Sequence, residues 1–76
     1  MIKKKLTQRE TEVYLFICAY RAQYGFSPSM RDICKGCYLA STRSAHLYID
    51  ILQRKGYIKF IPRIPRSITL TDREAI

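Results

Sequence analysis

Residues 39–58, LASTRSAHLYIDILQRKGYI, contain the main pattern from which the fold is predicted. Its second half carries apolar side chains at the spacing of one helix face, at Ala45, Tyr48, Ile49 and Leu52. Arg54, Lys55 and Gly56 then form a typical helix end, because basic side chains suit the C-terminal end of the helix dipole and glycine suits the residue that follows it. We therefore expect a helix over residues 41–55.

The start of this helix consists of short hydrogen-bonding side chains and one guanidinium, at Ser41, Thr42, Arg43 and Ser44. Short side chains let a helix end approach the major groove of DNA, where hydroxyls and arginine can bind base edges. The free N–H groups of the helix start can hold a phosphate. We interpret residues 41–44 as a DNA-contacting helix start, with His46 and Leu47 one turn further on. The alternative is that Ser41 only caps the helix and its neighbours face solvent, since serine is common at N-caps in every class of protein.

Two further helices are expected upstream. Thr7 and Glu10 have the spacing of a capping box, in which each side chain binds the backbone N–H of the other residue. Ser29 and Asp32 repeat this pattern after a proline. Apolar side chains recur at helical spacing after both signals. We therefore expect helices over residues 7–24 and 29–37.

Downstream, the apolar period changes from that of a helix to that of a strand. Residues 57–61 predict a strand with Ile58 and Phe60 inward, and residues 67–70 predict a second strand with Ile68 and Leu70 inward. A turn with two prolines separates them, which indicates a hairpin. Three helices followed by a basic hairpin are the layout of an α+β winged helix-turn-helix with a two-stranded β-hairpin wing.

The size and charge of the chain narrow the class of function. Its 76 residues allow one domain with a small core, and a buried catalytic pocket would compete with that core for the same residues. The formal net charge of +8, from 14 Lys and Arg against 6 Asp and Glu, favours a polyanionic partner. Nucleic acid is the first candidate and an anionic membrane surface the second. No segment approaches the roughly 20 apolar residues of a membrane span.

The three cysteines and the single histidine do not indicate an enzyme. Cys34 and Cys37 form a C-x-x-C spacing, and with Cys18 and His46 they suggest a zinc site at first sight. No second paired motif exists, and Cys18 and Cys37 fall at apolar-face positions, so buried reduced thiols are favoured. His46 has no evident partner for general acid–base catalysis. We expect no metal, no cofactor and no catalytic residue.

Four segments carry a resemblance to a known family: LTQRETEVYLFI, YGFSPSMRDI, LASTRSAHLYIDILQRKGYI and PRSITL. From Leu6 to Leu70 the chain resembles the N-terminal DNA-binding domain of LexA repressors. The opening LTxRExEV pattern alone also begins LuxR-type domains, but those are all-helical and lack the hairpin. The resemblance implies a winged helix-turn-helix that binds an inverted-repeat operator in double-stranded DNA, as a homodimer on the DNA.

The resemblance also implies the residues that contact DNA. They lie at the start of the third helix and in the wing, at Ser41, Thr42, Arg43, Ser44, His46, Leu47, Arg63 and Arg66. We add the other helix ends near the basic surface as candidate phosphate contacts, at Ser29, Arg31, Arg54 and Lys55.

This sequence departs from the family pattern in three ways. Tyr38 stands where members usually have glycine, so it carries strain if that position needs a positive φ. Arg43 stands where many relatives have a smaller or amide side chain, which leaves the preferred operator sequence open. LexA repressors continue into a Ser–Lys autoprotease domain, whereas the sequence given ends at Ile76, so we assign it no self-cleavage.

We therefore expect a basic arm over residues 1–5, a DNA-binding domain over residues 6–71 and a tail over residues 72–76. The expected function is sequence-specific transcriptional repression in the bacterial cytosol, at the nucleoid, of the kind that LexA exerts in the SOS response. No membrane and no small-molecule substrate is expected. The alternative is a winged-helix interaction module that modulates another repressor or docks in a complex.

Overall fold

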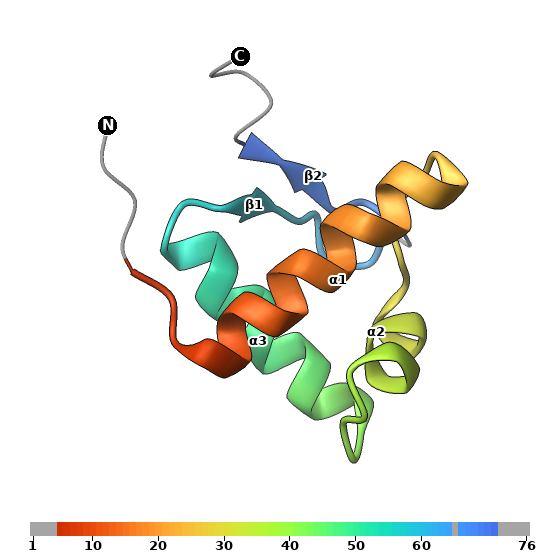
Figure 1. The fold of residues 1–76 in the computed structure, drawn as a ribbon. Coiled ribbons are helices and arrows are strands. Elements are labelled where there is room, and N and C mark those ends of the chain that lie inside the picture. The colour runs from red at the N-terminus through yellow and green to blue at the C-terminus, as the bar shows by residue number, and fades with distance from the viewer. Residues whose placement is uncertain (1–4, 65, 72–76) are drawn as a thin grey trace.

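Three helices precede a two-stranded sheet in the computed structural model, which describes residues 5–64 and 66–71 (Figure 1). In chain order these elements are α1 (Gln8–Tyr24), α2 (Met30–Gly36), α3 (Thr42–Arg54), β1 (Ile58–Lys59) and β2 (Thr69–Leu70). The predicted α+β winged helix-turn-helix is confirmed. The predictions for residues 1–4 of the arm and for the tail over 72–76 lie outside the described residues.

The first two helices begin at the capping boxes that the sequence predicts. The Glu10 N–H donates to the Thr7 hydroxyl over 3.2 Å, and the Thr7 N–H donates to the Glu10 carboxylate over 3.0 Å. Ser29 and Asp32 exchange the same two bonds, both at 3.1 Å. Each box satisfies two N–H groups that lack a partner within the helix. The predicted range of α1 agrees with the structure once its N-cap residue is counted, and those of α2 and α3 agree once the capping residues at both ends are counted.

The core lies where the three helices meet the sheet. It is made of apolar side chains that are almost completely buried, at Val13, Ile17, Ile33, Ala45, Ile49, Leu52, Ile58 and Ile68. In Figure 1, α1 crosses in front of α3, and the two strands lie along one side of the helices. Because α3 buries one stripe against this core, its opposite stripe and its first turn remain at the surface.

The strands are shorter than predicted. The antiparallel ladder pairs only Ile58 with Leu70 and Lys59 with Thr69. Beyond the ladder, side chains rather than a facing strand bind the backbone N–H and C=O groups. The Phe60 N–H donates to the Gln53 side chain over 2.8 Å, and the Ser67 hydroxyl both accepts from and donates to the backbone of Ile61. These side-chain bonds replace the ladder bonds that longer strands would make. The predicted inward side chains are confirmed, because all four belong to the core or pack against it.

The turn between α2 and α3 contains a strained residue. Tyr38 has a φ of 57°, in the left-handed region, and 90% of its side chain is exposed. A non-glycine residue pays a steric cost in this region. The positive φ on which the predicted strain at Tyr38 depended is therefore present.

None of the helices that the structure describes has the length and apolar content needed to cross a membrane.

Candidate nucleic-acid interface

The start of α2, the first half of α3 and the wing enclose a surface groove of about 520 Å³. We define the wing as residues 60–68, which connect the two strands. Six of the residues lining the groove were predicted as DNA contacts, namely Ser29, Arg31, Thr42, His46, Arg63 and Arg66. The structure therefore brings together side chains from three segments that lie far apart in the sequence.

The start of α3 differs from the other two helix starts because no side chain caps it. Ser41 occupies the N-cap position in an extended conformation, but its hydroxyl makes no capping hydrogen bond, and the first turn holds no acidic residue. Ser41, Thr42 and Arg43 are exposed, and Ser44 is half-buried. Of the alternative interpretation, the structure contains the N-cap position of Ser41 and the exposed neighbours, but not the capping hydrogen bond from the Ser41 side chain. The hydroxyls and the first N–H groups of α3 are thus left for solvent or a ligand.

One turn further along α3, His46 and Leu47 lie on its exposed side. The His46 ring meets the Phe60 ring edge-on, with 6.4 Å between the ring centroids. Leu47 leaves 59% of its side chain exposed, which gives this part of the helix an apolar contact surface. Phe60 was predicted only as an inward strand residue, and the structure shows that its ring also contacts His46 on the exposed side of α3.

Two further arginines line the groove from different elements. Arg31 belongs to α2, and Arg63 lies in the wing with a φ of 71°. Both are exposed, and neither forms an ion pair with another residue in the described ranges, which also holds for Arg43. Guanidinium groups that are not neutralised by the protein can bind phosphate or guanine.

Arg66, the second predicted wing contact, has partners within the protein. Its guanidinium Nη1 donates to the Ser27 carbonyl over 3.0 Å and to the Tyr20 hydroxyl over 3.3 Å, and lies 3.2 Å from the Asp32 carboxylate. The hydrogen bond that Arg66 donates to the Tyr20 hydroxyl is the main cause that raises the pKa of Arg66. Sequence analysis missed this network, because Asp32 was identified only as a capping residue and no local pattern indicates a partner in a distant turn.

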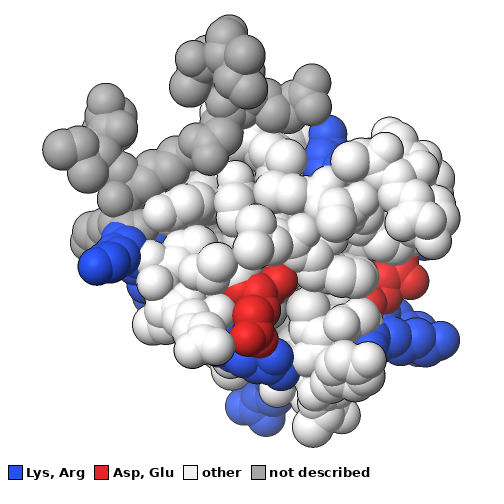
Figure 2. Space-filling view, viewed as in Figure 1, with Lys and Arg blue, Asp and Glu red and all other residues white. Residues whose placement is uncertain are grey.

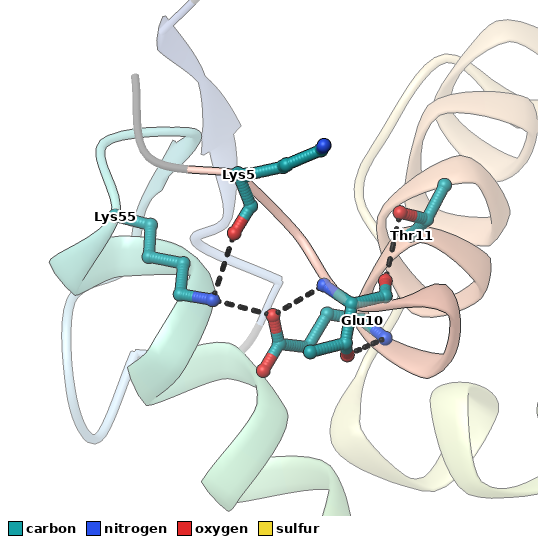
Figure 3. Close-up of polar contacts among 5 residues, drawn as sticks. Lys5, Glu10, Thr11 and Lys55 are labelled. Atoms are coloured by element: carbon teal, nitrogen blue, oxygen red, sulfur yellow. Dashed lines mark hydrogen bonds and ion pairs between the residues drawn. The ribbon is translucent and has the colours of Figure 1, made fainter.

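The remaining two candidates lie at the other end of α3. Arg54 pairs with Asp50 one turn earlier, at 3.1 Å, and both side chains are exposed. The Lys55 ammonium donates to Glu10 over 2.7 Å and to the Lys5 carbonyl over 3.0 Å (Figure 3). Lys55 therefore connects the end of α3 to the N-terminal segment and does not line the groove. The hydrogen bond from Lys55 is also the main cause that lowers the pKa of Glu10.

The face formed by α1 is largely uncharged. In Figure 2, viewed as in Figure 1, most of this face is neutral, and the lysine and arginine side chains that are visible lie at its rim. Acidic side chains are also visible on it, so a polyanion finds few cations on this face.

The cysteines do not form a metal site in the described part of the chain. No three His, Cys, Asp or Glu side chains within residues 5–64 and 66–71 are arranged to hold one metal ion. All three cysteines have free thiols, and burial raises the pKa of the Cys37 thiol. Such a thiol is less reactive at neutral pH, because the thiolate is the reactive form.

A helix with an uncapped start, a basic groove beside it and a hairpin wing define a winged helix-turn-helix of the DNA-binding class. Residues 3–67 match the family described as LexA DNA binding domain, and the chain belongs to that family. The resemblance stated from the sequence is confirmed.

Three LexA repressors illustrate the relationship. The protein of Thermosipho melanesiensis is 45% identical over 71 residues, which are 93% of this chain and 35% of that protein. The protein of Thermosipho africanus is 46% identical over 70 residues, with 92% and 35% coverage. The protein of Caldicellulosiruptor saccharolyticus is 37% identical over 71 residues, with 93% and 35% coverage. The chain thus spans about a third of the length of the curated relatives it matches.

Proposed function

We propose that this chain is the operator-reading part of a LexA-type transcriptional repressor. The observation that carries the proposal is the start of α3, which is exposed, uncapped and free of acidic residues, beside a groove lined by arginines from α2 and the wing. Membership of the LexA DNA-binding domain family supports the same function. A repressor of this kind acts on genomic DNA, so we place it at the nucleoid in the cytoplasm and in a response of the SOS type.

Different residues recognise the DNA bases and orient the protein on the DNA backbone. Thr42, Arg43 and His46 enter the major groove, where the hydroxyl, guanidinium and imidazole can bind base edges. Arg31 and Arg63 bind phosphates on either side and fix the orientation of α3. Two copies bind an inverted repeat, because a symmetric dimer matches a palindromic site.

The proposal is tested by selecting bound duplexes from a random pool at low and at physiological salt. Enrichment of an inverted repeat supports a repressor-type reader, and the half-site spacing gives the dimer geometry. Binding that shows no sequence enrichment and disappears as salt rises contradicts base reading by α3, since non-specific contacts are electrostatic. That result favours the interaction-module alternative.

A matched pair of variants identifies the reading residue. Arg43→Ala is expected to broaden the selected sequence at one position and to weaken operator binding by about 1–3 kcal/mol. Lys35→Ala removes the same charge from the exposed end of α2, outside the groove. It is expected to leave the selected sequence unchanged. An identical selected sequence for both variants would remove Arg43 from the proposed reading set.

A further inference from the structure

The two arginines of the wing have opposite surroundings. Arg63 is exposed and has no ion pair among the described residues, whereas Arg66 binds three groups from α1, α2 and the turn between them. The Arg66 guanidinium also lies over the Phe26 ring, 4.9 Å from its centroid. All three polar contacts are made by Nη1, so the protein holds the Arg66 side chain through one nitrogen and the face of its guanidinium.

The backbone of Arg66 indicates that these contacts hold it in place. Its φ is 56°, a left-handed conformation that is unfavourable for a residue with a Cβ atom. Strained conformations persist where the surrounding contacts over-determine them. The contacts of the guanidinium with the Ser27 carbonyl, Asp32 and Phe26 provide such a constraint.

Asp32 is the acidic end of this connection and is itself well fixed. Its Oδ2 accepts from the Ser29 N–H and from the Tyr20 hydroxyl, both at 3.1 Å, and also faces Arg66. The same carboxylate thus caps α2 and receives the wing. A second connection lies nearby, where Arg21 of α1 donates to the Ile68 carbonyl over 2.9 Å.

We propose that Arg66 is a positioning residue, and that the Asp32–Arg66 pair sets the width of the DNA-binding groove by holding the wing against the start of α2. Arg63 then contacts the DNA, and Arg66 determines where Arg63 lies. This inference rests on the proposed function of the groove. The two possible roles of Arg66, positioning the wing and contacting a phosphate, predict different effects when the charge of Asp32 is removed.

Asp32→Asn separates the two roles by the sign of its effect. The substitution raises the net charge and keeps an oxygen that can accept the capping hydrogen bond of α2. If Arg66 contacts phosphate, this variant binds DNA as tightly as the wild type or more tightly, because an opposing charge is gone and Arg66 is released. If Arg66 positions the wing, operator binding weakens by about tenfold despite the added positive charge.

The experiment measures the affinity of the full chain for its selected operator at fixed salt. Asp50→Asn is the control, because it also removes an acidic partner of an arginine, and it is expected to bind no more weakly than the wild type. Arg66→Lys keeps a charge that suffices for a phosphate but cannot reproduce the planar guanidinium contacts, so it is expected to weaken binding by about tenfold. Wild-type affinity in both Asp32→Asn and Arg66→Lys would overturn the inference.

Amide hydrogen exchange in the free protein tests the connection without DNA. The wing N–H groups of Ile61 and Ile64 donate to the Ser67 hydroxyl and to the Ile61 carbonyl. Their exchange is expected to accelerate about tenfold in Asp32→Asn and Arg66→Lys, but not in Arg63→Lys. Equal exchange rates in all three variants would overturn the inference about Arg66, whether or not the wild type selects an operator. Failure of the wild type to select an operator would instead reject the proposed function.

Discussion

Thr7 and Ser41 occupy the same position at the starts of two helices, yet only one of them stabilises its helix. The Thr7 hydroxyl accepts the Glu10 N–H at 3.2 Å, and Glu10 is bound in turn by Lys55 of α3. The Ser41 hydroxyl makes no capping bond. The start of α1 therefore uses its polar groups within the fold, whereas the start of α3 leaves its polar groups exposed.

The difference has a physical meaning. Satisfying the N–H groups of a helix start stabilises a protein, commonly by about 1 kcal/mol per capping side chain. A site that binds an anion or a base edge needs those same groups to remain available. In this small domain, the start of α1 contributes to stability, whereas the proposed DNA binding uses the start of α3. Four predictions test that division, beginning with the largest expected effect.

Glu10→Ala should produce the largest loss of stability. It removes the capping-box partner of Thr7 and leaves the Lys55 ammonium, which is mostly buried, without its carboxylate. We expect the Tm to fall by about 10 °C. Thermal unfolding followed by circular dichroism measures the effect. As the control, Glu12→Ala removes an exposed partner of Arg9 and should change the Tm little.

Acid should reproduce part of this loss in the unmodified protein. The Lys55 ammonium lowers the pKa of Glu10, and the Ser29 N–H lowers the pKa of Asp32. A carboxylate with a lowered pKa stabilises the fold above its ordinary pKa, and this contribution disappears as pH falls through the lowered value. We therefore expect a steady Tm from pH 7 to about 5 and a decrease below that range.

Glu10→Gln identifies which carboxylate is responsible for the acid effect. This variant lacks one titrating group, so its Tm should depend less on pH below about 5 than that of the wild type. The same pH profile for both proteins would show that the Glu10–Lys55 pair does not contribute to acid stability.

Thr7→Ala and Ser41→Ala, two small changes at equivalent positions, test the difference between the starts of α1 and α3. Thr7→Ala should lower the unfolding free energy by about 1 kcal/mol, because the Glu10 N–H loses its acceptor. Ser41→Ala should leave it almost unchanged but weaken operator binding several-fold, by about 1 kcal/mol. Urea unfolding and operator titration measure the two effects. Equal losses of stability would mean that Ser41 caps α3 in solution.

Most of the fold could be predicted from the sequence, because its signals are local. Capping boxes at Thr7 and Ser29 and the apolar stripe of α3 involve residues within a few positions of one another, and the structure contains each of them. The strands were predicted too long, because the side chains of Gln53 and Ser67 replace ladder bonds, which no alternating pattern reveals.

The site could be predicted only in part, for a related reason. The exposed start of α3 follows from its residue types, and the groove lining agrees with six of the predicted contacts. The partners of Arg66 and Lys55 lie 34–50 residues away in the chain, so their internal contacts follow from the tertiary fold alone. Residue type and charge made these two residues resemble Arg63, although their surroundings differ.

The smallest expected effect concerns Tyr38, which lies just before the start of α3. Its positive φ costs roughly 1 kcal/mol, and its side chain is 90% exposed, so removing the ring sacrifices little packing. Tyr38→Gly should relieve this strain, while the greater freedom of glycine in the unfolded chain offsets about half of the gain. We expect a net stabilisation of about 0.5 kcal/mol, measured by urea unfolding, with unchanged operator binding. Tyr38→Ala keeps a Cβ atom and should give no gain, so equal stabilisation by both variants would show that the ring, and not the backbone, is unfavourable at this position.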